Sequence, residues 1–135
     1  MNLEQVLSRR DPYQLYLVLF KIEGQNSYKP GITGHDDVTK RFESYLEEGI
    51  ISDFKILTSS YFSTREEAYK AEQKLFVEVA NKFGGYKGHK NRITRFHNFY
   101  TKINYNGITE IRKYDETEVN YCQDYIDNNG RKEYN

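Results

Sequence analysis

The stretch LYLVLFKIEGQNSYKPGIT, residues 15–33, decides how the fold begins. Leu15 to Ile22 is dense in Leu, Val, Tyr and Phe, which predicts a buried strand. Residues 23–27 are turn formers, so Tyr28 to Thr33 is predicted to return as a second strand and to form a hairpin with the first. Because Pro30 has no N–H to donate, the second strand should pair on only one side there.

Helical and extended patterns alternate after this hairpin. Asp36 and Asp37 precede a set of apolar residues at helical spacing, namely Val38, Phe42, Tyr45 and Leu46, and Gly49 suits the end of that helix. Residues 50–62 predict a third strand. Thr64 and Glu67 have the spacing of a capping box, which predicts the start of a long helix ending near Phe83.

The last third of the chain predicts an addition to this core. Residues 84–98 form a basic loop, and 99–126 contain a β-hairpin across Asn106-Gly107 followed by a helix from Thr117 to Ile126. Residues 127–135 are predicted to be a frayed tail. We therefore expect one domain over residues 1–135 of the α/β (α+β) class, with three layers and a small mixed or antiparallel sheet of about three strands.

Composition limits the functional classes. The chain has 135 residues, 20 basic and 20 acidic side chains, and a single cysteine, Cys122. One cysteine excludes an internal disulfide and a cysteine-rich zinc site. The longest nearly apolar run, Leu15 to Phe20, is too short to cross a membrane, and the N-terminus lacks the order of a signal peptide. We expect a cytoplasmic protein without a membrane partner.

The charges are unevenly distributed although their sum is zero. Residues 79–109 hold six basic residues, two histidines and no acid. Aromatic residues lie between these charges, a combination that suits phosphate contact and base stacking, although an ordinary solvated loop would have the same charges. The candidate nucleic-acid contacts are Lys82, Lys87, Lys90, Arg92 and Arg95.

Glu72 is the most informative charged residue of the predicted core. It lies three and four positions from Leu75 and Ala68, so it borders the apolar stripe of the long helix. A carboxylate there costs free energy unless it is paired or holds a metal ion. Glu72 is therefore a candidate metal ligand, with a salt bridge as the alternative.

Four positions, in order along the predicted elements, resemble the GIY-YIG nuclease superfamily over residues 13–83. Leu15-Tyr16 stands where the family has Gly-Ile-Tyr, and Lys29-Pro30-Gly31 stands where it has Tyr-Ile-Gly. Arg41 and Glu72 match the helix arginine and the helix glutamate. The sequence Tyr28-Lys29-Pro30-Gly31-Ile32-Thr33 is similar to a phage-type branch whose second motif is Tyr-Lys-Ile-Gly-x-Thr.

This resemblance implies a metal-dependent endonuclease of phage or mobile-element type that hydrolyses DNA phosphodiester bonds. Glu72 would hold one Mg²⁺ or Mn²⁺, Arg41 would bind a phosphate oxygen, and Tyr16 would be the general base. Lys29 would stabilise the phenolate of Tyr16. Neighbours on a strand point to opposite faces, so either Lys29 or Tyr28 faces the site, and we favour Lys29.

Several points stay open from sequence. The auxiliary candidates are Tyr28, His35, Asn91 and Asn98. A homodimer or a protein partner would supply the surface that a domain of this size lacks. The alternative function is a catalytically inactive binding protein with the same fold, which would bind nucleic acid, a nucleotide or a host protein.

Overall fold

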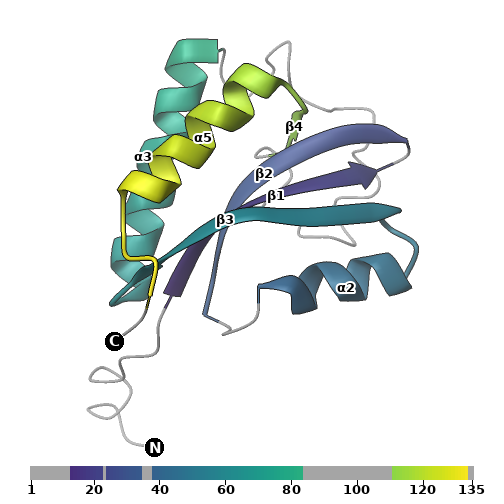
Figure 1. The fold of residues 1–135 in the computed structure, drawn as a ribbon, viewed down its shortest axis with the longest axis horizontal. Coiled ribbons are helices and arrows are strands. Elements are labelled where there is room, and N and C mark those ends of the chain that lie inside the picture. Colours follow the sequence, from purple (N-terminus) through teal and green to yellow (C-terminus); the bar gives the residue numbers. More distant parts are fainter. Residues whose placement is uncertain (1–12, 23, 35–37, 84–110, 134–135) are drawn as a thin grey trace, which may run out of the picture.

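The computed structural model describes residues 13–22, 24–34, 38–83 and 111–133. Its four strands form one antiparallel sheet in the order β3-β1-β2-β4, and the three described helices lie on its two faces (Figure 1). The predicted α+β class with three layers is confirmed. The sheet has four strands rather than about three, because a short part of the C-terminal region joins it.

The elements follow the predicted order. Their bounds are β1 Tyr13–Ile22, β2 Gln25–Thr33, α2 Thr39–Glu47, β3 Asp53–Phe62, α3 Arg65–Phe83, β4 Arg112–Lys113 and α5 Glu116–Asn128. The predicted first strand of the C-terminal hairpin, residues 99–103, and the basic loop, residues 84–98, lie outside the described residues.

The β1–β2 hairpin sets which side chains share a face. Its register pairs Tyr16 with Gly31 and Val18 with Lys29, and directly paired residues point to the same side of a sheet. Of the described strands, only β1 pairs with β2 at Pro30, since β4 pairs with β2 at two residues further along. This agrees with the missing N–H of proline.

Two hydrophobic cores lie on the two faces of the sheet. On one face, α2 packs through Phe42 against a cluster that includes Tyr16, Val18 and Phe20. On the other face, α3 and α5 pack against Leu15, Leu17 and Tyr28 (Figure 1). Strand β1 is buried on both sides, which explains why its sequence is a nearly continuous apolar run.

The long helix α3 begins with the predicted capping box. The Glu67 N–H donates to Oγ1 of Thr64 at 3.2 Å, and Oε2 of Glu67 accepts from the N–H of Ser63 at 3.2 Å. The first bond satisfies a backbone donor of the first helical turn, and the second joins the Glu67 carboxylate to Ser63, the residue before the N-cap. The local sequence is therefore sufficient to fix where α3 starts.

The C-terminal segment is ordered against β3, so the prediction of a frayed tail is wrong for residues 127–133. Tyr61 and Arg131 exchange two backbone hydrogen bonds, of 2.6 Å and 2.9 Å. The Lys132 ammonium donates to the carbonyl of Ser59 at 3.0 Å and also contacts Asp127. Pairing with a sheet edge compensates for the low apolar content of this segment.

This attachment is expected to weaken in acid. The hydrogen bonds from Lys132 and Thr58 hold the pKa of Asp127 below its ordinary value of 3.8. A carboxyl whose folded pKa is lowered stabilises the fold above its unfolded pKa, and that contribution disappears as the pH falls through the folded pKa. The protection factors of the Tyr61 and Arg131 amides, measured by hydrogen exchange and NMR, should fall as the pH drops below about 3.8. In Asp127→Asn this added pH dependence should be absent, and its persistence would contradict the assignment.

Candidate functional site

Tyr16 lies across the backbone of Gly31 on the α2 face of the sheet. A Cβ atom added at Gly31 would lie 2.6 Å from Cζ of Tyr16 and would also meet the phenol oxygen. The ring makes an edge contact with Phe42 of α2, with centroids 5.8 Å apart, and the side chain is 1% exposed. Glycine is required here because any side chain would occupy the space of the phenol.

Gly31→Ala is expected to displace Tyr16 and to destabilise the fold by about 1–3 kcal/mol, the usual cost of overpacking. Chemical denaturation followed by circular dichroism measures the loss. The same substitution in a Tyr16→Ala background should cost much less, because the clashing ring is gone. Equal losses in the two backgrounds would show that the contact with Tyr16 is not the cause.

Lys29 lies on the same face of the sheet as Tyr16, whereas Tyr28 lies on the other. Lys29 pairs with Val18, is 6% exposed, and donates through Nζ to the carbonyl of Pro30 at 3.3 Å. Gln14 and Thr33 are paired with each other on this face and are also buried. Along the β1–β2 pairs from Gln14 to Val18, this face therefore carries a buried phenol, ammonium, amide and hydroxyl.

Arg41 lies in α2, the helix that covers this same face through Phe42. The side chain of Arg41 is outside what the structure describes. The backbone thus places Arg41, the residue predicted to bind phosphate, on the same side of the sheet as Tyr16.

Glu72 is buried in α3, on the helix face that also holds Leu75 and Val79. Its side chain is 6% exposed, and Nε2 of Gln73 donates to its Oε1 at 3.3 Å. Leu75 and Val79 pack on the sheet face opposite to Tyr16. The sheet therefore lies between the helix that carries Glu72 and the face that carries Tyr16 and Lys29.

Whether a divalent cation can bind depends on which side chains are available as its ligands. Within the described ranges, no group of three or more His, Cys, Asp or Glu side chains could hold a metal ion. One carboxylate, with water and substrate phosphate oxygens completing the shell, is a binding mode that Mg²⁺ accepts. That mode needs only the single carboxylate that Glu72 offers, and the side chain that carries it is 6% exposed.

A buried ionic cluster that sequence reasoning missed joins β2, β4 and α5. Glu118 accepts at Oε1 from Nε of Arg112 at 2.7 Å and from the hydroxyl of Tyr28 at 2.8 Å. Burial, and then the charge of Glu118, raise the pKa of the adjacent Cys122 thiol to about 12, so this cysteine is a neutral packing residue. Tyr28, an auxiliary candidate from sequence, thus contacts Glu118 on the face away from Tyr16.

Of the remaining positions predicted to bind nucleic acid or to assist catalysis, only Lys82 lies within the described residues. Lys82 is exposed near the end of α3, with Nζ 5.2 Å from the ring centroid of Tyr121. The other predicted positions lie outside the described residues, and they are His35, Lys87, Lys90, Asn91, Arg92, Arg95 and Asn98.

Comparison with known proteins gives no relative: no family model, no curated protein and no solved structure matches this chain. Among the described helices, none combines the length and the apolar character needed to span a membrane.

Proposed function

We propose that this chain is a metal-dependent endonuclease that hydrolyses DNA phosphodiester bonds, of the GIY-YIG type and of phage or mobile-element kind. The observation that carries the proposal is the placement of Tyr16 over Gly31, with Lys29 on the same face and α2 above it. In this proposal the phenol that crosses Gly31, on the same sheet face as the buried cation of Lys29, is the general base. The proposed setting is the cytoplasm of a bacterium or of a phage-infected cell.

In this proposal each of four residues has its own role in the reaction. Tyr16 removes a proton from the attacking water, and the ammonium of Lys29 favours the phenolate form electrostatically. Arg41, on the helix above the face, binds a non-bridging phosphate oxygen. Glu72 holds the divalent cation, Mg²⁺ or Mn²⁺, which supplies charge stabilisation to the phosphate and to the leaving oxygen when bound.

Two observations favour a second candidate, a binding protein with this fold that does not cleave. Tyr16 is 1% exposed, and Glu72 lies on a helix packed against the opposite sheet face. Such a protein would bind nucleic acid, a nucleotide or a host protein. A nuclease requires substrate access to Tyr16, so the two candidates differ in whether DNA is cut at all.

Plasmid cleavage in the presence of Mg²⁺ or Mn²⁺ tests the proposal. The wild-type chain should nick DNA, EDTA should stop the reaction, and Glu72→Gln and Arg41→Ala should each lower the rate by at least about 10²-fold. Glu66→Gln is the matched control, because Glu66 is an exposed carboxylate on the same helix in an ion pair with Lys70. It should cleave like wild type.

Two outcomes would reject the nuclease proposal. One is the absence of metal-dependent cleavage of duplex, single-stranded and branched DNA by a folded wild-type chain. The other is cleavage that Glu72→Gln leaves unchanged, which points to a contaminating nuclease. Tight DNA binding without cleavage would favour the binding protein.

A further inference from the structure

A second candidate binding surface lies on the α3 and α5 side of the sheet, beside the β1–β2 turn. Leu19 packs at the border of the core that α3 and α5 form, which places its side chain on that face. Register then places Lys55 beside Leu19, and Asn26 and Asp53 beside Lys21, on the same face. The described helices α3 and α5 lie toward the other end of the sheet (Figure 1).

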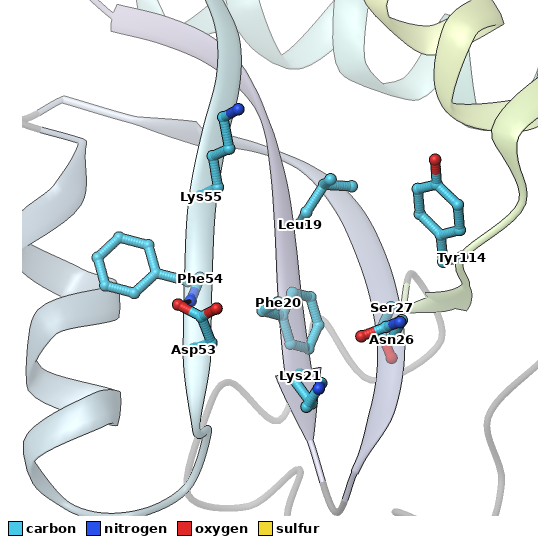
Figure 2. A pocket seen from close by; sticks show the side chains of 9 residues that line it. All are labelled: Leu19, Phe20, Lys21, Asn26, Ser27, Asp53, Phe54, Lys55 and Tyr114. Atoms are coloured by element: carbon cyan, nitrogen blue, oxygen red, sulfur yellow. Dashed lines mark hydrogen bonds between the residues drawn. The ribbon is translucent and has the colours of Figure 1, made fainter.

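This part of the face is hollowed. A concave pocket of about 380 Å³ is lined there by residues of β1, β2 and β3 and by Tyr114, directly after β4. Figure 2 shows Lys55, Leu19 and Tyr114 arranged across the sheet, with Lys21, Asn26 and Asp53 nearer the turn. The volume lies in the range of pockets that take one small ligand or one unit of a polymer.

The charged and aromatic side chains that line the pocket indicate which class of ligand it suits. Lys21 and Lys55 are exposed cations on this face, and Asp53 is the acid between them, so the hollow has one net positive charge in a chain that is neutral overall. Tyr114, a residue that is 43% exposed, presents an aromatic ring, and Leu19 gives an apolar floor. Cations beside an exposed aromatic ring on a sheet face suit phosphates and an unpaired base.

We propose that this hollow binds single-stranded nucleic acid, one nucleotide at a time along the strand. The base stacks on Tyr114 against Leu19, the Asn26 amide contacts its polar edge, and Lys21 and Lys55 contact the flanking phosphates. A duplex is a poorer ligand, because its base faces are stacked within the helix and cannot reach Tyr114. Binding here does not depend on the proposed nuclease activity, since the hollow and Tyr16 are on opposite faces of the sheet.

Fluorescence anisotropy with a short fluorescein-labelled oligothymidylate tests this surface. EDTA is included so that no cleavage occurs. Tyr114→Ala should weaken binding about tenfold, which is the usual effect of removing a stacked aromatic ring. Lys21→Ala and Lys55→Ala should each lower the slope of log affinity against log salt by about 0.7.

The control is Tyr69→Ala, which removes a tyrosine of similar exposure, 45%, from the outer side of α3. It should bind like wild type, and thermal melting should show that each variant is folded. Equal affinity of Tyr114→Ala and wild type, or no binding of the oligonucleotide at low salt, would overturn the proposal. Duplex binding that is as tight and as dependent on Tyr114 would overturn the stacking mode.

Discussion

Glu118→Ala is expected to destabilise the folded chain by about 3–5 kcal/mol, the usual cost of removing one partner from a buried ion pair. Glu118 is the acceptor for both Arg112 and Tyr28, at 2.7 Å and 2.8 Å. Without it, the Arg112 guanidinium, which is fully buried, would lose its counter-ion inside the protein. A small domain has only about 5–15 kcal/mol of total stability, so this loss is a large fraction of it.

Urea denaturation followed by circular dichroism measures the effect. Glu116→Ala is the matched control, because Glu116 is an exposed carboxylate two positions earlier in the same helix. It should change the stability by at most about 1 kcal/mol, the scale of a charge interacting with a helix terminus.

A combined variant separates the ionic cluster from simple packing. Arg112→Met with Glu118→Leu and Tyr28→Phe removes both charges and the hydroxyl together. It should recover most of the loss, because replacing a whole buried ion pair by apolar groups is often neutral. If the combined variant is as unstable as Glu118→Ala alone, the loss arises from packing, and the assignment of the cluster is wrong.

This cluster marks the limit of what the sequence could predict. The start of α3 depends on Thr64 and Glu67, which are three residues apart, so local spacing predicted it. Tyr28 and Glu118 are 90 positions apart, and no local pattern links them. Arg112, the other partner of Glu118, reaches the cluster through the pairing of β4 with β2, and no local pattern predicts that pairing.

The same distinction applies to the candidate site: local patterns predict some of its features, and tertiary packing determines the others. Alternation along a strand was enough to predict that Lys29 and Tyr28 point to opposite faces, and the pattern around Leu75 was enough to predict that Glu72 borders the apolar stripe. The position of α3 on the face opposite to Tyr16 is a matter of tertiary packing, and periodicity within one helix does not determine it. The role of Gly31 depends on the cross-strand register with Tyr16, which becomes visible only when the two strands are aligned.

Under the proposed nuclease mechanism, Tyr16→Phe is expected to lower the rate of DNA cleavage by about 10²–10⁴-fold, the range that a general base contributes. Phenylalanine keeps the ring over Gly31 and its contact with Phe42, so the chain should stay folded. Tyr69→Phe, at an exposed position of α3, is the control and should cleave like wild type. Both variants are compared with wild type in single-turnover cleavage of plasmid DNA with Mg²⁺. Wild-type cleavage by Tyr16→Phe would remove the phenol from the mechanism.

The pH dependence of cleavage distinguishes an electrostatic role of Lys29 from a purely structural role. Lys29 is a buried cation on the same face as the phenol, and Lys29→Met removes the charge that the proposed mechanism assigns to stabilising the phenolate. Its pH–rate profile should move to higher pH, and cleavage should recover in part in alkaline buffer. Lys29→Arg keeps the charge and should keep the wild-type profile at a lower rate, because the guanidinium is bulkier. A uniform loss at every pH in Lys29→Met would show that Lys29 only supports the strand, and Tyr16 would then need another cation, for which Arg41 is the candidate.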